Sequence, residues 1–292
     1  MIRLLTSCFG RGLRTALAMP AIVFLKWFGN LVFAICGVIG FMYIFYDQFA
    51  HSAEAQRMMS SLSLDSVAEL YGSNAQSIPL AAITLGPLAL VCLVYNLFLT
   101  GGILLRLQTG SRPPWGVFFS ACGRYLLRLL AIGLLCAILF AVIVALPYWG
   151  MMKGEHYLTR NDTSGAPTFA MTWVRWGIAF VLLSWAARVY DYARVRLFLE
   201  PKRNFFVAFG YGVYFATRRW GSTLALWLAL VAFPLILAGF ITAATLFFPL
   251  DNLTNVIVTF VLGQVVLIVR TLGGIARLGG EMTYLQRRMV NR

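Results

Sequence analysis

Long apolar stretches alternate with shorter polar ones along the whole chain, and this pattern predicts membrane-spanning helices. A helix of about 20 residues crosses a bilayer hydrocarbon core of roughly 30 Å. Backbone N–H and C=O groups cannot stay unpaired in lipid, so apolar stretches of this length are expected to be helical. Six stretches qualify, at residues 21–46, 80–105, 126–149, 172–195, 223–248 and 253–276.

The composition fits the same class of protein. The chain has 292 residues, of which 60% are hydrophobic and 12% are charged, and its mean hydropathy is +0.80. A soluble domain of this length needs more charged side chains to cover its surface. We therefore expect an all-α integral membrane protein that forms a single transmembrane domain over residues 1–292.

The basic residues are distributed unevenly between the two sides of the predicted membrane. The net charge is +14. When basic residues at the span ends are counted with the nearest polar segment, 20 of the 24 Lys and Arg residues belong to one set: the N-terminus, the second and fourth connections, and the C-terminus. Only three of the ten acidic residues lie there. The positive-inside rule therefore places both termini in the cytoplasm. A surface of this charge should prefer membrane lipids with anionic headgroups.

Three of these cytoplasmic segments are basic, aromatic and amphipathic: "RLLTSCFGRGLRTALAMP", "RPPWGVFFSACGRYLLRL" and "KRNFFVAFGYGVYFATRRW". Each precedes an odd-numbered span, which is typical of a helix lying in the membrane interface. One interpretation is a threefold repeat of interfacial helix plus hairpin. The other is that any six-span protein with both termini inside produces basic segments of this kind.

A charged cluster at the end of the fourth predicted span is the first candidate site. Arg188, Asp191 and Arg194 are spaced three apart and share one helix face, while Arg196 and Glu200 are four apart and can pair. One interpretation is a helix foot whose arginines extend towards lipid headgroups and hold Asp191 in a structural ion pair. The alternative is a coupling or gating carboxylate. A catalytic base is disfavoured because two arginines stabilise the ionised form of Asp191.

A further arginine and two amides complete the candidate residues. Arg270, near the end of the sixth predicted span, can extend to the interface or pair with Asp191. Asn96 and Gln264 are the deepest amides, and each can hydrogen-bond between helices or line a path for a substrate. No acidic residue or histidine lies near the middle of a predicted span, which disfavours an ion-driven transporter.

The sequence offers little chemistry for catalysis or cofactor binding. His51 and His156 both lie in predicted outer loops, and the five cysteines lack metal-ligand spacing. No nucleotide-binding, hydrolase or zinc-protease motif occurs in a suitable context. Nucleic-acid recognition is also disfavoured, since no motif of that kind accompanies the basic charge. We expect no catalytic residue, no cofactor and no metal.

Three stretches carry a family resemblance: "NLFLTGGIL" (Asn96–Leu104), "DYARVRLFLE" (Asp191–Glu200) and "AFGYGVYFATRRW". With them the chain resembles uncharacterised bacterial six-helix inner-membrane proteins, and it is similar to the membrane domain attached to some glycerophosphodiester phosphodiesterases. The phosphodiesterase barrel, with its catalytic glutamates and histidines, does not occur in this sequence, so the resemblance implies no activity. It implies a location in a bacterial inner membrane.

Two functions fit these patterns. The first is a non-catalytic structural, assembly or accessory subunit of a larger membrane complex, with other membrane protein subunits as partners. The second is a transporter or permease for a small solute or a lipid. A polar central cavity lined by Asn96 and Gln264 would favour the permease. An apolar face rich in small and aromatic residues, and not covered within the chain, would favour the subunit.

Overall fold

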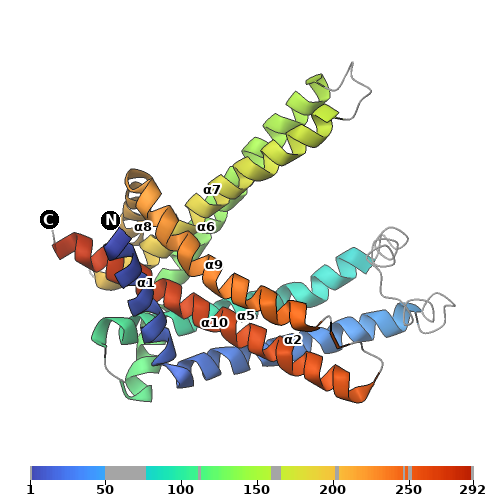
Figure 1. The fold of residues 1–292 in the computed structure, drawn as a ribbon, viewed down its shortest axis with the longest axis horizontal. Coiled ribbons are helices and arrows are strands. Elements are labelled where there is room, and N and C mark those ends of the chain that lie inside the picture. The colour runs from blue at the N-terminus through green and yellow to red at the C-terminus, as the bar shows by residue number, and fades with distance from the viewer. Residues whose placement is uncertain are drawn as a thin grey trace. The chain divides into compact units, whose positions relative to one another are not determined.

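The computed structural model of the protein describes residues 2–49, 77–110, 113–158, 166–200, 204–245, 247–248 and 252–290. These residues form α-helices and short connections, and no strand occurs among them. The helices are α1 (Ile2–Leu17), α2 (Pro20–Phe49), α5 (Ser77–Thr109), α6 (Trp115–Leu158), α7 (Ala166–Leu199), α8 (Phe205–Arg218), α9 (Trp220–Thr245) and α10 (Leu253–Val290) (Figure 1).

The predicted spans at 21–46, 80–105, 126–149, 172–195 and 253–276 each lie within one helix, in the order α2, α5, α6, α7 and α10. The predicted span at 223–248 corresponds to α9, which ends earlier, at Thr245. Among the residues that the structure describes, five helical segments are long and apolar enough to cross a membrane: Pro20–Ile39, Leu85–Thr109, Trp115–Ala145, Trp220–Thr245 and Leu253–Met289. The protein is therefore a multi-pass α-helical membrane protein.

The fourth predicted span differs from the other five. It is helical throughout as part of α7. However, α7 is not among the described helices that are long and apolar enough to cross a membrane. Arg175 lies near one end of its apolar stretch and Arg188 near the other, and both lower its mean hydropathy. A total of six spans therefore stays a prediction.

Local sequence signals explain where several of these helices begin and end. Pro20 is the first residue of α2, a position where the missing N–H costs no helical hydrogen bond. After α5, Gly110 adopts φ +66°, and its N–H donates to the Arg106 carbonyl at 3.0 Å, which is a glycine C-cap. Pro201 follows the end of α7, as proline disfavours helix at the preceding residue.

The chain divides into two compact units. The smaller unit, Phe24–Leu97, contains most of α2 and α5. Inside it, the rings of Phe33 and Tyr95 meet edge to face with centroids 5.5 Å apart. The contact joins the two helices through aromatic packing.

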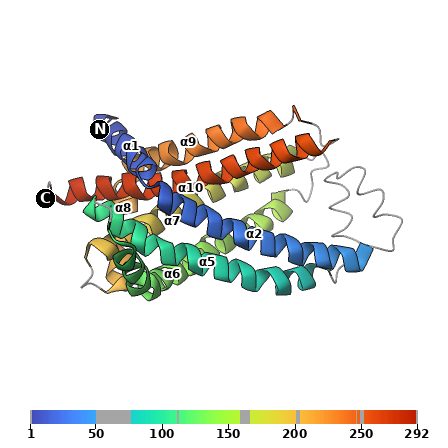
Figure 2. The same ribbon diagram turned by 90° about the horizontal axis from the view of Figure 1, so that it is seen from below.

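The larger unit comprises Met1–Val23 and Phe98–Arg292. Helices α6 and α7 lie side by side, as do α9 and α10, while α8 packs on α7 and α1 on α10 (Figures 1 and 2). Glycines allow these close approaches, because a Cβ on Gly12 would lie 2.9 Å from the Gly280 nitrogen. A Cβ on Gly212 of α8 would likewise lie 2.7 Å from the Val189 carbonyl of α7. Small residues let helix backbones meet in this way.

The three predicted interfacial segments do not behave alike. The first and third form separate helices, α1 and α8, each directly before a long apolar helix. Most of the second is the beginning of α6, which continues as helix from Trp115 to Leu158. The threefold repeat therefore stays a prediction.

Helix α10 continues well beyond the predicted span at 253–276. Its 38 residues correspond to about 57 Å at ~1.5 Å per residue, which exceeds a bilayer core of roughly 30 Å. The additional turns, up to Val290, place further charged residues beside α7.

Candidate functional site

Five charged residues from two helices form the candidate site, which we call the charged cluster: Arg188, Asp191 and Arg194 of α7, and Arg277 and Glu281 of α10. The α7 residues follow one another at three-residue spacing and the α10 residues at four, so each set shares one helix face. All are buried except Arg277, whose side chain is 31% exposed. The cluster thus lies inside the protein at the contact between α7 and α10.

Asp191 lies at the centre of the charged cluster, with a side chain that is 1% exposed. Its Oδ1 accepts a hydrogen bond from Nη2 of Arg194, one helical turn away. Its Oδ2 lies 3.3 Å from Nε of Arg277, which is ion-pair distance without the alignment of a hydrogen bond. The carboxylate therefore pairs with one arginine on its own helix and one on α10.

The α10 residue that approaches Asp191 differs from the expected one. Arg270 is exposed, whereas Arg277, seven residues and about two turns later, forms the ion pair. The sixth predicted span ends at residue 276, one residue before Arg277, whereas α10 continues as helix to Val290. The candidate pair of Asp191 with Arg270 is replaced by that of Asp191 with Arg277.

Arg188 does not pair with a carboxylate among the described residues, in contrast to the expected ion pair. Its side chain is 0% exposed. Nε donates to the Ser184 carbonyl at 3.0 Å, and Nη1 donates to the Trp220 carbonyl and to Oγ1 of Thr223, each at 3.1 Å. The guanidinium also lies 4.3 Å from the centroid of the Trp220 ring. Arg188 therefore joins α7 to the beginning of α9 through neutral oxygens and a cation–π contact.

The neighbouring arginines are also buried rather than extended towards lipid headgroups. Arg194 stacks on the Tyr190 ring at 4.1 Å. Arg196 forms the predicted pair with Glu200, with Nη2 2.5 Å from Oε1, and its guanidinium lies 4.3 Å from the Tyr211 ring of α8. The simple helix-foot interpretation is corrected here: protein groups, not lipid headgroups, surround these guanidinium groups.

Sequence reasoning missed both α10 members of the charged cluster, Arg277 and Glu281. Glu281 is 1% exposed, and neither carboxyl oxygen has a hydrogen-bond partner among the described residues. The charged groups that act on it are Asp191, Arg277 and Arg194. The four-residue spacing of Arg277 and Glu281 was the available signal, and it becomes informative only if α10 continues past residue 276.

The arrangement is suited to holding helices together. It connects α7 with α10 through Asp191 and with α9 through Arg188. The described pocket of the protein is lined by other residues. No group of three potential metal-binding side chains occurs in the described part of the chain. Asp191 is held by two guanidinium groups, one on α7 and one on α10, which suits a structural role.

The two candidate amides lie in different units and do not form a shared site. Asn96 donates from Nδ2 to Oδ1 of Asn30 at 2.8 Å and to the Cys92 carbonyl at 2.9 Å, which joins α5 to α2. Asn30 was not singled out from the sequence, although it lies in the middle of a predicted span. Gln264 is half-buried on α10 in the larger unit. Whether either amide lines a path stays a prediction.

The two histidines add nothing to the candidate site. His51 lies outside the described residues, as does the side chain of His156. The structure therefore leaves the expectation about these side chains untested.

No protein-family model, no curated protein and no solved structure matches this chain. The resemblance to six-helix inner-membrane proteins therefore stays a prediction, and the function is argued from the geometry.

Proposed function

We propose that this protein is a six-span, non-catalytic protein of a bacterial inner membrane and acts as a structural, assembly or accessory subunit of a larger membrane complex. Both termini lie in the cytoplasm in this proposal, and the charged cluster lies towards that side. The proposal is supported by the use of polar groups inside the chain and by an uncovered helix face.

The helix face that carries the proposal is on α9. Gly239 and Ala243 are exposed and four residues apart, and a Cβ on Gly239 would meet nothing within 4 Å. Phe240, beside them, is 72% exposed. Small residues at this spacing are typical of helix–helix contacts in membranes. Gly12 and Gly212 allow such contacts within the chain. The exposed small residues of α9 would allow the same kind of contact with a helix of a partner protein.

A second exposed apolar face, with residues at helical spacing, lies on α10. On α10, Leu253, Ile257 and Phe260 are each more than half exposed. Such faces are satisfied by lipid or by another membrane helix. The burial of the charged cluster supports the non-catalytic part of the proposal, because its carboxyl groups do not face a described pocket.

Gentle extraction of the tagged protein, followed by native electrophoresis and mass spectrometry, tests the proposal. The expected result is one defined complex at fixed stoichiometry. Gly239→Leu with Ala243→Leu should remove the partner, while Gly263→Leu, on an α10 glycine that also meets nothing within 4 Å, serves as the control. Recovery of only a monomer or homo-oligomer with lipid would overturn the subunit proposal.

A permease is the second candidate, and prolines inside two helices favour it. Pro87 lies within α5 and Pro234 within α9. A proline removes one backbone donor and frees a carbonyl, as happens in the interrupted helices of transporters. Uptake assays with Asn96→Leu and Gln264→Leu variants test this alternative. Transport that is unchanged in both variants would argue against a path lined by these amides.

A further inference from the structure

Two buried carboxyl groups of the charged cluster have oxygens that accept no hydrogen bond from the described residues. Asp191 of α7 and Glu281 of α10 are each 1% exposed. The oxygens concerned are Oδ2 of Asp191 and both carboxyl oxygens of Glu281. Buried polar atoms are nearly always hydrogen-bonded, because an unused acceptor costs its desolvation energy without compensation. These oxygens therefore call for a donor that the described side chains do not supply.

The two carboxyl groups lie close to each other. Glu281 follows Arg277 by four residues and shares its face of α10, and Nε of Arg277 lies 3.3 Å from Oδ2 of Asp191. The Glu281 side chain is itself within hydrogen-bonding reach of Asp191. Two ionised carboxyl groups cannot form that hydrogen bond, because each of them only accepts. A single proton on one of them would supply the donor.

The charges around Glu281 come from the two helices that form the cluster. The charged and titratable groups that act on it are Arg188, Asp191, Tyr192, Arg194 and Arg277. Helix α9, which also packs on α10, contains no titratable side chain. Helix α1 packs on α10 too, but its described titratable side chains, Cys8, Arg11 and Arg14, are not among the groups that act on Glu281. The site is therefore a contact of α7 with α10.

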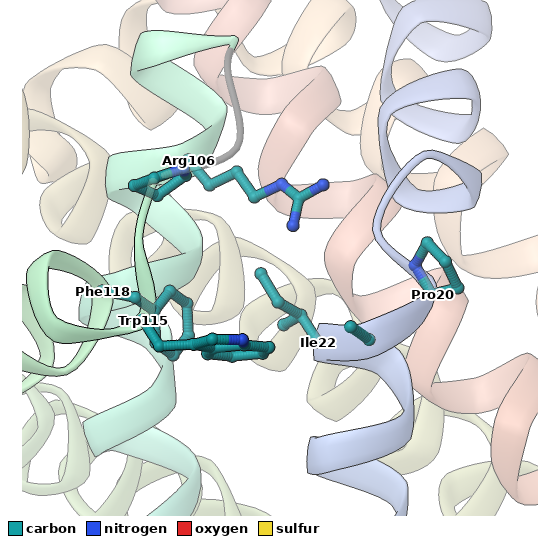
Figure 3. A pocket seen from close by; sticks show the side chains of 7 residues that line it. Pro20, Ile22, Arg106, Trp115 and Phe118 are labelled. Atoms are coloured by element: carbon teal, nitrogen blue, oxygen red, sulfur yellow. The ribbon is translucent and has the colours of Figure 1, made fainter.

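The surroundings of the pair favour a proton over a larger ligand. A metal ion such as Ca²⁺ takes several oxygen ligands, and no group of three potential metal-binding side chains occurs in the described part of the chain. The described pocket, lined by Arg106, Trp115 and Phe118 among others (Figure 3), contains no residue of the charged cluster. A proton needs neither a cavity nor a further ligand.

We infer that Asp191 and Glu281 form a proton-binding site, which holds one proton between two buried carboxyl groups and thereby links α7 to α10. The proton comes from water and forms an O–H bond on one carboxyl group, which donates to the other and removes one of the two negative charges. It belongs to the pair rather than to one residue. The inference goes beyond the proposed accessory role, since such a site can occur in a subunit or in a protein that acts alone.

Chemical unfolding of the full chain in mixed micelles, measured from about pH 5 upwards, tests the site. Carboxyl groups of the unfolded chain are ionised in this range, so the folded wild type binds one proton more and its stability falls as the pH rises. The folding equilibrium constant should fall up to about tenfold per pH unit, until the folded pair releases its proton. Glu281→Gln should remove this dependence.

The matched control is Glu200→Gln, on a glutamate that is 31% exposed and paired with Arg196. This variant should keep the pH dependence of the wild type. The readout is the change with pH rather than the stability at one pH, because an amide removes both the charge and the acidic proton. An equal change with pH in the wild type and in Glu281→Gln would overturn the proton site.

Infrared spectroscopy of the folded protein provides a second measurement that does not require a variant to fold. A protonated carboxyl group has a C=O stretching band that an ionised one lacks, and free carboxyl groups are ionised at about pH 6. The wild type and Glu200→Gln should show this band at that pH, and Glu281→Gln should not. A wild type without the band, or a band that persists in Glu281→Gln, would overturn the assignment.

Discussion

Two helix contacts in this protein use different chemistry to satisfy polar groups in apolar helices. The charged cluster joins α7 to α10 through fully charged side chains, with Asp191 paired to Arg194 and Arg277. The contact of α2 with α5 uses neutral groups, with the Asn96 amide donating to Asn30 and the Tyr95 hydroxyl to the Leu25 carbonyl at 2.7 Å.

The difference lies in what happens when one partner is removed. Removal of one partner from a buried ion pair leaves a charge without compensation, which costs about 3–5 kcal/mol. Loss of a neutral hydrogen bond between membrane helices costs about 0.6 kcal/mol on average, because other partners can substitute. The two contacts should therefore respond very differently to substitutions of similar size.

The largest effect is expected at Asp191. Asp191→Asn keeps the shape but leaves the buried Arg194 without its carboxylate, so we expect a loss of about 3–5 kcal/mol in the free energy of unfolding. Thermal unfolding in detergent, monitored by size-exclusion chromatography, measures the change. Stability within about 1 kcal/mol of wild type would show that the ion pairs are dispensable.

An intermediate effect is expected at the close approach of α2 and α5. A Cβ on Gly29 would overlap the Tyr95 ring, so Gly29→Ala should cost about 1–3 kcal/mol through overpacking. Gly37→Ala is the matched control on the same helix, because its Cβ would lie 3.4 Å from Leu88. Equal stability of the two variants would mean that α2 and α5 do not pack as described.

A smaller effect is expected from the amide pair. Asn30→Ala and Asn96→Ala, alone and together, form a double-mutant cycle with an expected coupling of about 0.6 kcal/mol. Chemical unfolding in mixed micelles is a suitable measurement. A coupling as large as that of the ion pairs would remove the distinction between the charged and the neutral contact.

An effect of similarly small size is expected at Glu281. Its oxygens accept no hydrogen bond from the described residues, so Glu281→Gln should change the unfolding free energy by less than about 1 kcal/mol. Both substitutions replace a carboxyl group by an amide. A difference in stability between Glu281→Gln and Asp191→Asn therefore distinguishes the roles of the two carboxyl groups. A loss as large as that of Asp191→Asn would assign Glu281 to the ion-pair network.

The sequence predicts the helices far better than their contacts. Apolar length fixes the approximate positions of the helices, and Pro201 marks the end of α7 within one or two residues. The apolar pattern predicts a span at 253–276, whereas α10 continues to Val290. Continuation of the helix there depends on packing against α7 and α1, which a one-dimensional hydropathy pattern does not contain.

Local pairs in the candidate site were predictable, whereas pairs between helices were not. Three- and four-residue spacing indicates Asp191 with Arg194 and Arg196 with Glu200, and both pairs are present. The choice of Arg277 over Arg270 depends on how α10 is rotated and shifted against α7. The burial of Arg188 depends on oxygens of α9, which no spacing within α7 reveals.

The central claim is that the charged cluster joins α7 to α10. A double-mutant cycle between these two helices tests this claim most directly. Asp191→Asn is combined with Arg277→Gln and, as the matched control, with Arg270→Gln, and thermal stability is measured for each single and double variant. The structure predicts a coupling of about 1–2 kcal/mol for Asp191 with Arg277 and none above about 0.3 kcal/mol for Asp191 with Arg270. Coupling to Arg270 alone would contradict the described contact.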